Sequence, residues 1–275
     1  MTSNNAPEPK LQALTQYIQS QGSALVALSG GIDSTLLSLL AHRVLGNSAH
    51  ALTVRSEFFI SSEASFIERF VGEFHVSHSF LEVSVLGDAR VVSNPENRCY
   101  YCKRLIFENL VREARTRSCA AVFDGTNVDD LGEDRPGIQA LHELGIASPY
   151  IDAGIDKRDI LRFAASLGLE SYIHPSNTCL ATRIPAHTPL REDVLKMVEK
   201  AESFMHSCGF EVVRVRYHEP YAARIEVIEK DLPRLLNTSL RAELISRFKD
   251  LGFRRVSIDM EGYRIKKDPP AEGSL

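Results

Sequence analysis

The segment Ser-Gly-Gly-Ile-Asp-Ser-Thr, residues 29–35, constrains the fold most, because it joins two apolar runs. The run before it, Ala-Leu-Val-Ala-Leu, has the length of a buried strand, and the run after it, Leu-Leu-Ser-Leu-Leu, suits a buried helix. Gly30 and Gly31 allow positive φ and close backbone approach, so successive N–H groups can converge on one point. The N-terminus of the following helix directs its positive end at the same point. The segment therefore predicts a phosphate-binding loop.

The polar side chains of this segment can complete such a site. They are Ser29, Asp33, Ser34 and Thr35. The hydroxyls add hydrogen-bond donors, and the carboxylate adds an oxygen that can hold a metal ion or orient the amides. The alternative is an ordinary glycine-rich turn between strand and helix, with the serines acting as caps.

The spacing of the glycines separates three kinds of phosphate loop. A Walker loop needs a lysine directly after its last glycine, whereas Ile32 follows Gly31 here. A dinucleotide fingerprint needs a third glycine, which is absent at Ser34 and Thr35. The remaining pattern, Ser-Gly-Gly-x-Asp-Ser, resembles the pyrophosphate loop (PP-loop) of the ATP-pyrophosphatase superfamily. Those enzymes adenylate a carbonyl or carboxyl oxygen, release pyrophosphate, and let a nitrogen or sulfur nucleophile displace AMP.

Alternating apolar runs and amphipathic stretches extend from residue 24 to about residue 168, as in parallel βαβ units. Strands are predicted over 24–29, 51–55, 80–85 and 121–124, and helices over 34–45, 62–74, 100–116, 137–144 and 157–167. This is the pattern of an α/β domain with a doubly wound parallel sheet, in which ligands bind at the carboxyl ends of the strands. Gly30 and Gly125 both lie at such ends.

Residues 174–190 carry three prolines and no clear periodicity, so they are predicted to be an ordered connector at a domain boundary. We expect domains at 1–180 and 190–268. The second is predicted as a smaller α+β unit with the order α-β-β-α-β. Its predicted elements are a helix over 191–207, strands over 211–217 and 222–229, a helix over 231–249 and a strand over 254–264.

The composition excludes some partners. The 275 residues are 44% hydrophobic, enough for a core, and the net charge of −4 gives no general attraction to nucleic acid or anionic membrane. No apolar stretch reaches the ~18 residues that span a bilayer, and the first residues lack the pattern of a signal peptide. We therefore expect a cytoplasmic protein with no nucleic-acid or membrane partner.

Later parts of the chain can add to the nucleotide site. Thr53 and Val54 end a predicted strand, where backbone groups can bind adenine. The segment Asp-Gly-Thr-Asn, residues 124–127, follows another strand and precedes Asp130 and Arg135. By itself this segment would be a common turn with a helix cap. Together with the first loop it resembles the second motif of the superfamily.

Three of the five cysteines are candidates for sulfur or metal chemistry. Cys99 and Cys102 are spaced i, i+3 at the start of a predicted helix, which places both on one face, and Cys179 lies in the connector. We expect the helix N-terminus and the nearby basic residues Arg98, Lys103 and Arg104 to lower the thiol pKa values. Two half-buried apolar cysteines are the alternative.

Two metal sites suit these thiols. A structural zinc ion needs four ligands, and only His174 offers a fourth. Three thiolates can instead hold a [4Fe–4S] cluster that leaves one iron open to an exogenous sulfide. Cys119 and Cys208 are interpreted as core residues.

With these residues in view, the chain resembles the LarE family of sulfur transferases over nearly its whole length. The shared motifs are Leu-Ser-Gly-Gly-Ile-Asp-Ser, Asn-Arg-Cys-Tyr-Tyr-Cys-Lys, Asp-Gly-Thr-Asn-Val-Asp-Asp, Arg-Pro-Gly, Cys-Leu-Ala-Thr-Arg-Ile-Pro, Val-Arg-Val-Arg and Ala-Arg-Ile-Glu. The resemblance implies an adenine nucleotide alpha hydrolase-like fold for residues 1–180. It also implies a substrate and oligomerisation domain for residues 190–268 and a hexamer built as a dimer of trimers.

The family's reaction supplies the expected activity. ATP with Mg²⁺ adenylates pyridinium-3,5-biscarboxylic acid mononucleotide, and sulfur then enters to give the thiocarboxylate, twice in all. The product serves the nickel-pincer cofactor of lactate racemase. Some members sacrifice the sulfur of the cysteine that matches Cys179, whereas members with all three cysteines use a [4Fe–4S] cluster. Cys99 and Cys102 favour the second mechanism here, with the sacrificial route as the alternative.

The resemblance also assigns roles to residues of this chain. The expected catalytic residues are Asp33, Cys179 and Arg183. The expected ATP-binding residues are Ser29, Gly30, Gly31, Asp33, Ser34, Thr35, Thr53, Val54, Gly125, Asn127, Asp130 and Arg135. The expected cluster ligands are Cys99, Cys102 and Cys179. The expected residues for the substrate's phosphate are Arg214 and Arg216, which alternate along a strand and so face one way, with Glu202 and Glu226 to orient them.

Three other functions are compatible with the sequence. A tRNA thiolase of the same superfamily would need a basic RNA-binding face, which the net charge does not favour. An amidating ligase would need a source of ammonia, and the sequence shows no glutaminase segment. A regulator that senses ATP and redox state would bind ATP without forming an acyl-adenylate.

Overall fold

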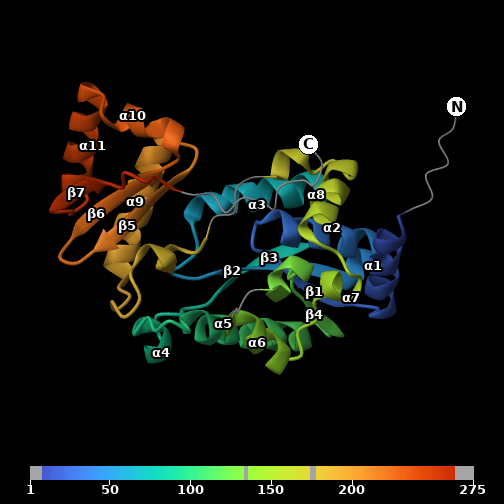
Figure 1. Ribbon diagram of the computed structural model, residues 1–275. Helices are drawn as coiled ribbons and strands as arrows, with labels where there is room; N and C mark the ends of the chain where they lie inside the picture. Colours follow the sequence, from blue (N-terminus) through green and yellow to red (C-terminus); the bar gives the residue numbers. More distant parts are fainter. Residues whose placement is uncertain (1–7, 133–135, 174–177, 264–275) are drawn as a thin grey trace, which may run out of the picture. The chain divides into compact units, whose positions relative to one another are not determined.

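The computed structural model describes residues 8–132, 136–173 and 178–263 (Figure 1). The chain divides into two compact units, Met1–Cys179 and Leu180–Leu275. The division falls inside the segment 174–190 for which the sequence predicts a connector.

The first unit contains a four-stranded parallel sheet with the order β3-β2-β1-β4. Its strands are β1 (Ala24–Ala27), β2 (Ala49–Arg55), β3 (His78–Glu82) and β4 (Ala121–Phe123). Ala24 pairs with Ala49 on one side and with Ala121 on the other. Because the chain leaves β1 toward β2 and later returns to its other side at β4, the carboxyl end of β1 is a topological switch point. The predicted doubly wound parallel sheet is confirmed.

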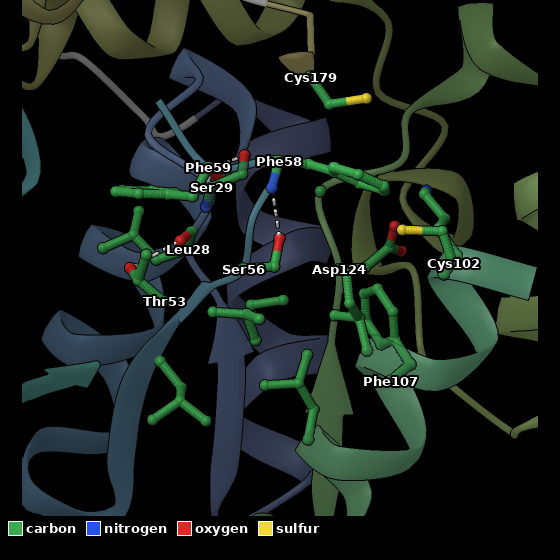
Figure 2. Close-up of a pocket in the computed structure, with 18 of the residues that line it drawn as sticks. Leu28, Ser29, Thr53, Ser56, Phe58, Phe59, Cys102, Phe107, Asp124 and Cys179 are labelled. Atoms are coloured by element: carbon green, nitrogen blue, oxygen red, sulfur yellow. Dashed lines mark hydrogen bonds between the residues drawn. The ribbon is translucent and has the colours of Figure 1, made fainter. Parts of the chain in front are cut away.

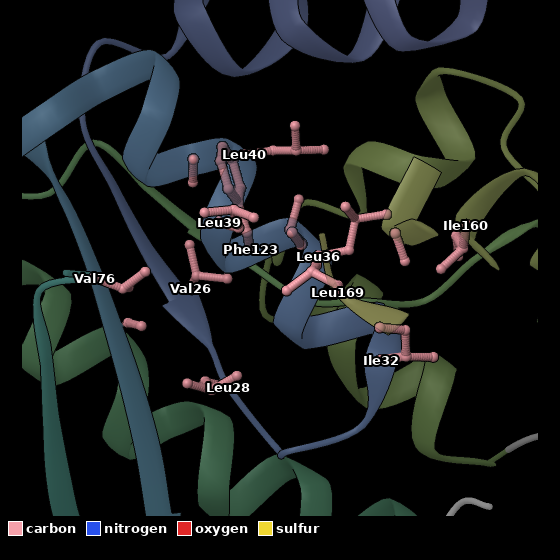
Figure 3. Close-up of a cluster of buried hydrophobic side chains, with 14 of the residues drawn as sticks. Val26, Leu28, Ile32, Leu36, Leu39, Leu40, Val76, Phe123, Ile160 and Leu169 are labelled. Atoms are coloured by element: carbon pink, nitrogen blue, oxygen red, sulfur yellow. The ribbon is translucent and has the colours of Figure 1, made fainter. Parts of the chain in front are cut away.

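Helices cover both faces of this sheet (Figure 1). On one face lie α1 (Pro9–Ser20), α2 (Ile32–Leu45), α3 (Ser61–Phe74) and α8 (Lys157–Ser166). Their apolar side chains meet the strands in the cluster of Figure 3, which includes Val26, Leu36 and Phe123. On the other face lie α5 (Arg98–Thr116) and α6 (Pro136–Glu143).

A second cluster of buried side chains holds α5 and α6 against the sheet; it contains Leu25, Leu52, Phe107, Leu110 and Val122. Neighbouring strand residues such as Leu25 and Val26 point to opposite faces, so a continuous apolar strand supplies both clusters. Short elements complete the unit: η1 (Gly46–Ser48), α4 (Ala89–Val92), η2 (Val128–Gly132), α7 (Pro149–Asp152) and η3 (Glu170–Tyr172).

The second unit contains a three-stranded sheet with the order β5-β6-β7. Its elements are η4 (Leu180–Arg183), α9 (Glu192–Ser207), β5 (Val213–His218), β6 (Ala222–Val227), η5 (Glu229–Asp231), α10 (Leu232–Leu235), α11 (Thr238–Asp250) and β7 (Arg255–Ile258). Strands β5 and β6 are antiparallel, whereas β6 and β7 are parallel.

The prediction of one continuous helix over 231–249 is wrong, because the structure has three separate elements there: η5, α10 and α11. The break comes at Asn237, whose side-chain oxygen accepts hydrogen bonds from the N–H groups of Ser239 and Leu240. A side chain that accepts these hydrogen bonds caps a helix N-terminus, so α11 begins after Asn237 as a separate helix.

Among the described residues, no helix has both the length and the apolar character that crossing a bilayer requires.

Candidate nucleotide site and its surroundings

The loop after β1 depends on one glycine more than on the other. Gly30 has φ of 88°, and a Cβ atom there would lie 2.8 Å from the Glu63 Oε2 atom. Gly31 has φ of −71°, a value that any residue adopts. The expectation that both glycines supply unusual backbone angles is therefore wrong for Gly31.

Two serines fix the shape of this loop. The Ser34 hydroxyl accepts a hydrogen bond from the Ser29 N–H at 3.1 Å and donates to the Gly31 carbonyl at 3.0 Å. The Ser29 hydroxyl lies 3.0 Å from the same Ser34 oxygen. These bonds hold the backbone bent over the N-terminus of α2, where the unpaired N–H groups of the first turn favour an anion.

Thr35 lies in that first turn and is 1% exposed. Its hydroxyl has no hydrogen-bond partner within the part of the chain that the structure describes. A buried hydroxyl without a partner is costly. A phosphate at the helix N-terminus would offer it an acceptor.

The second loop, after β4, lies directly against the first. A Cβ atom at Gly125 would be 3.1 Å from the Ser34 nitrogen and 3.3 Å from the Asp33 carbonyl carbon. Only glycine allows the two loops to approach this closely without displacement. Asp124 accepts hydrogen bonds from the hydroxyls of Thr126 and Ser148 and is 5% exposed.

Asn127 and Asp130 shape the turn that follows. The Asn127 N–H donates to the Asp130 carboxylate at 3.0 Å, and the Asn127 side-chain oxygen accepts from the Asp129 N–H at 3.0 Å. Asn127 therefore stabilises the backbone of η2 through hydrogen bonds, while Asp130 also lines the adjoining cavity.

A cavity of about 430 Å³ opens at this edge of the sheet (Figure 2). Nine of the predicted site residues line it: Ser29, Asp33, Ser34, Thr53, Val54, Gly125, Asp130, Cys102 and Cys179. Gly30, Gly31, Thr35, Asn127 and Cys99 are not among the lining residues. The volume is in the range of small-molecule sites in proteins.

The cavity also has an apolar wall that the sequence did not reveal. It is formed by Phe58 and Phe59, which follow β2, and by Ile106, Phe107 and Leu110 of α5. Flat apolar walls suit an aromatic ring, such as adenine or a pyridinium. No motif marks these residues, because they share the cavity only after α5 packs on the sheet.

The charged lining is mostly acidic. Among the described residues it has four carboxylates, Asp33, Glu63, Asp124 and Asp130, and one ammonium, Lys103. The Lys103 side chain packs directly against Gly137 of α6. A Cβ atom at this position would lie 2.8 Å from the lysine Cδ atom, so only glycine leaves room for it. A triphosphate entering such a cavity needs accompanying cations.

Asp33 already has a cation against it. The Lys157 Nζ atom lies 2.8 and 2.7 Å from the two carboxylate oxygens of Asp33. The hydroxyl of the buried Tyr150 donates to the Asp33 carbonyl at 2.8 Å, which fixes the backbone from behind. No sequence motif marks Lys157, whose only signal is its place at the start of a helix.

The residues around Asp33 suit a magnesium ion that is bound mainly by nucleotide. Within the described residues, no three His, Cys, Asp or Glu side chains are grouped to hold a metal ion. Mg²⁺ usually takes one or two carboxylates and completes its shell with phosphate oxygens and water. The Lys157 ammonium shows that a cation fits against the Asp33 oxygens.

The cysteines differ in their surroundings. Cys99 and Cys179 are exposed, whereas Cys102 is half-buried. Burial, with a smaller contribution from the neighbouring Cys179 and Cys99, raises the pKa of the Cys102 thiol to about 12. The expectation that nearby basic residues lower this pKa is wrong for Cys102, because burial outweighs them.

The basic residues have other partners. Arg104 points away to Glu108 and Glu143, at 3.0 and 2.9 Å. The Arg98 guanidinium donates to Asn94 and lies 3.8 Å from the Cys99 sulfur. The charges of Arg98 and Lys103 lower the pKa of the Cys102 thiol, but by less than burial raises it.

We expect Cys102 to react with iodoacetamide far more slowly than Cys99 and Cys179 at pH 7. A pKa of about 12 leaves roughly one thiol in 10⁵ ionised at that pH, and only the thiolate is nucleophilic. The rate should rise as the pH approaches the raised pKa. Mass spectrometry of peptides after timed alkylation measures the order. Equal labelling of the three cysteines at pH 7 would contradict it.

In the second unit, Arg183 is fully buried and paired. Its guanidinium contacts both Glu202 oxygens, with Nε to Oε1 at 2.9 Å and Nη2 to Oε2 at 3.0 Å. Glu202 also accepts from the Val215 N–H at 2.8 Å. Arg183 therefore joins η4 to α9 and β5, and its catalytic role remains a prediction.

Arg214 and Arg216 lie on one face of β5, as alternation predicts. The Arg216 Nε atom lies 3.0 Å from the Glu226 Oε2 atom of β6, as expected for an orienting carboxylate. Glu202 is instead bound by Arg183. Burial lowers the pKa of Arg214, and the Arg183 charge lowers it further.

Replacing Glu202 with alanine is expected to destabilise the protein by about 3–5 kcal/mol, because the Arg183 charge would remain buried without its main partner. Urea denaturation followed by circular dichroism measures the loss. Glu192→Ala on the same helix is the control, since its pair with Lys196 is exposed and worth about 0–1 kcal/mol. Equal stability of the two variants would show that the Arg183 pair contributes little.

Two predicted residues lie outside the described residues: Arg135, assigned to the ATP site, and His174, considered as a fourth zinc ligand.

Comparisons with known proteins identify relatives of this chain. A family model described as asparagine synthase matches residues 11–93, which include the loop at Gly30. An uncharacterized protein of Synechocystis is 34% identical over 94% of this chain and 97% of the Synechocystis protein. An uncharacterized protein of Methanocaldococcus jannaschii is 36% identical over 87% of this chain and 90% of the M. jannaschii protein.

A third relative has a functional name. The pyridinium-3,5-bisthiocarboxylic acid mononucleotide synthase of Lactiplantibacillus plantarum is 33% identical over 93% of this chain and 92% of its own. The similarity thus spans both units. The chain therefore belongs to the LarE family of ATP-dependent sulfurtransferases, within the PP-loop superfamily.

Proposed function

We propose that this protein uses ATP to convert pyridinium-3,5-biscarboxylic acid mononucleotide into its bisthiocarboxylic acid. The observation that carries the proposal is the full-length similarity to the synthase of L. plantarum, whose name states that product. The cavity of the first unit supports it, because loop residues suited to ATP and two cysteines line the same space.

The first step forms a mixed anhydride. A carboxylate oxygen of the substrate attacks the α-phosphorus of ATP, the bond to the β-phosphate oxygen breaks, and pyrophosphate leaves. The loop at Gly30 and the N-terminus of α2 bind the leaving pyrophosphate through backbone N–H groups, with the Thr35 hydroxyl as a further donor. This step needs no general base, since the attacking carboxylate is already ionised.

Mg²⁺ would be held by Asp33 and, from the second loop, by Asp130, and would neutralise charge that develops on the phosphates. The four carboxylates of the lining cannot accept an ATP tetra-anion without such compensation.

The second step replaces AMP with sulfur. A sulfur nucleophile attacks the activated carbonyl carbon, and AMP leaves with the electron pair of the broken C–O bond. Cys99, Cys102 and Cys179 would hold a [4Fe–4S] cluster, which when bound supplies a site for an exogenous sulfide. In the described structure these three thiols are not grouped closely enough for a metal, so they would have to draw together to bind the cluster. The Cys102 thiol must lose its proton on metal binding.

A sacrificial route is the alternative source of sulfur. In it, Cys179 attacks as a thiolate and its Cβ–S bond later breaks by loss of the α-proton, leaving dehydroalanine. Cys179 is exposed and lines the cavity, which suits either route.

Arg214 and Arg216 would bind the phosphate of the substrate's mononucleotide. The described side chains around them include four guanidiniums, on Arg183, Arg214, Arg216 and Arg224, and three carboxylates, on Glu202, Glu226 and Asp259. These groups carry one net positive charge, which favours an anion. We further propose the family's hexamer, a dimer of trimers.

The direct test is anaerobic incubation of the purified, iron-reconstituted protein with ATP, Mg²⁺, sodium sulfide and the pyridinium diacid. AMP and pyrophosphate should form in equal amounts, and mass spectrometry should find sulfur in place of carboxylate oxygen. Nicotinamide mononucleotide is the matched control, because its amide has no carboxylate to adenylate. AMP formation without sulfur in the product would point to a different nucleophile, and no AMP formation would refute the proposal.

A further inference from the structure

The peptide group between Leu28 and Ser29 is the first of the phosphate loop, and side chains hold both of its polar atoms. Its N–H, on Ser29, donates to the Ser34 hydroxyl at 3.1 Å, and its carbonyl, on Leu28, accepts from the Thr53 hydroxyl at 2.8 Å. Because a peptide group is planar, these two bonds fix the direction in which the loop leaves the sheet. Leu28 and Thr53 both line the cavity (Figure 2).

The Thr53 hydroxyl takes the place of a backbone donor in this contact. Strands β1 and β2 pair in register as far as Ala27 and Leu52, and the Leu28 N–H donates to the Leu52 carbonyl at 3.0 Å. In a continued parallel ladder, the Leu28 carbonyl would next accept from the Val54 N–H. The register ends one step earlier, so the Thr53 side chain supplies the donor to a carbonyl whose residue is 2% exposed.

His78 of β3 contacts the other side of the same hydroxyl. Its Nε2 atom lies 2.9 Å from the Thr53 oxygen. His78 pairs with Ala51 and Thr53 pairs with Phe80, so the imidazole reaches diagonally between two neighbouring strands on one face of the sheet. The Phe80 ring packs edge-on against the imidazole, with 4.7 Å between the ring centroids, which limits its freedom to turn away.

The protons available decide which group donates. A hydroxyl has one proton, and that of Thr53 goes to the Leu28 carbonyl, which can only accept. The Thr53 oxygen therefore accepts from His78, which places a proton on Nε2 of the imidazole. Burial, with smaller contributions from His50 and Arg55, lowers the pKa of His78 to about 4, so the ring is neutral at pH 7 and Nδ1 carries no proton.

The other tautomer would undo this arrangement. A bare Nε2 atom would accept the Thr53 proton, and the buried Leu28 carbonyl would lose its donor. An Nε2–H instead leaves the carbonyl as the acceptor for that proton. One imidazole on β3 thus determines how the first peptide group of the loop is held, although none of the described lining residues belongs to β3.

We propose that His78 is a positioning residue for ATP. As the Nε2–H tautomer, it directs the Thr53 hydroxyl to the Leu28 carbonyl and so holds the phosphate loop in the form that binds the triphosphate. It acts through Thr53 and does not itself touch the nucleotide. This role rests on the ATP use in the proposed function, and not on the identity of the acid that is activated.

Nuclear magnetic resonance of the wild-type protein, labelled with nitrogen-15 in its histidines, tests the tautomer directly. The ring signals of His78 are assigned by their absence from the spectrum of His78→Gln. At pH 7 the ring should carry its proton on Nε2 and none on Nδ1. A proton on Nδ1, with or without one on Nε2, would overturn the proposal.

Calorimetry with Mg²⁺ and ATP tests the effect on binding. His78→Leu removes the donor and should bind ATP about five- to tenfold more weakly, whereas His78→Gln keeps an N–H for Thr53 and should stay within about twofold of the wild type. Both should bind AMP within about twofold of the wild type, because AMP lacks the β- and γ-phosphates. His50→Leu is the matched control, since His50 lies on the same sheet but contacts Ser77 and Ser79, and it should bind ATP like the wild type.

Thr53→Val tests the route through the hydroxyl. Because His78 acts through Thr53, the double variant Thr53→Val, His78→Leu should bind ATP no more weakly than Thr53→Val alone. Additive losses would show that His78 acts by another route and would overturn the proposal. Thermal unfolding of each variant first confirms that the protein is folded.

A purely structural histidine would give another pattern. A folded His78→Leu protein with unchanged ATP affinity, or equal losses in His78→Leu and His78→Gln, would each overturn the proposal. The readouts also separate it from the proposed function. If the binding pattern appears but the pyridinium diacid is not thiolated, only the substrate assignment fails. If thiolation occurs without the pattern, only the role of His78 fails.

Discussion

Replacing Asp33 with alanine is expected to slow substrate-dependent pyrophosphate release by at least about 100-fold, the usual effect of losing a preorganised group that stabilises transition-state charge. Asp33 lines the cavity, starts α2 beside the phosphate loop and carries the carboxylate against which a cation already lies. Without it, the metal ion is not held for the attack on the α-phosphorus. A coupled assay for pyrophosphate, run with and without the pyridinium diacid, measures the effect.

The matched control is Asp88→Ala. Asp88 is also at the start of a helix and also pairs with a cation, Arg90, but it does not line the cavity. This variant should release pyrophosphate at nearly the wild-type rate. If Asp33→Ala did the same, the loop would have no part in the reaction.

Loss of iron binding is the second large expected effect, in a variant with Cys99→Ala and Cys102→Ala. After anaerobic reconstitution, it should hold roughly a tenth or less of the iron and acid-labile sulfide of the wild type, since a cluster cannot be retained on one thiolate. Iron analysis, sulfide analysis and the visible absorption spectrum measure the outcome.

Cys119→Ala, Cys208→Ala provides the control, because these half-buried cysteines lie outside the cavity lining. It should bind iron like the wild type. A colourless wild-type protein that completes one turnover, with Cys179 converted to dehydroalanine, would support the sacrificial route instead.

Features that depend on neighbouring residues were predicted correctly more often than features that depend on residues far apart in the chain. The turn at Gly30 depends on residues that adjoin one another, and its φ of 88° and the helix after it appeared where the motif placed them. The strands of the first unit began within two residues of their predicted starts, because apolar runs bounded by turns are local signals. Helix α1 was not predicted, although its amphipathic stretch buries Leu14 and Ile18.

The acid–base state of Cys102 shows where local reasoning failed. Its neighbours in sequence are basic and it lies near the start of a helix, which favours a low pKa. The packing of the first unit buries the thiol beside other cysteines, and this raises the pKa to about 12. Burial depends on residues far away in the chain, so no window of sequence could report it.

The sequence by itself determined the parallel sheet, the phosphate loop after β1 and the motifs by which the LarE family is identified, because each of these rests on neighbouring residues and their spacing. Only the tertiary structure decided which residues share the cavity and which charges meet. Asp33 and Lys157 are 124 residues apart, and their contact exists because α2 and α8 pack on the same face of the sheet. Electrostatics acts through space, and the distances that control it are set by packing.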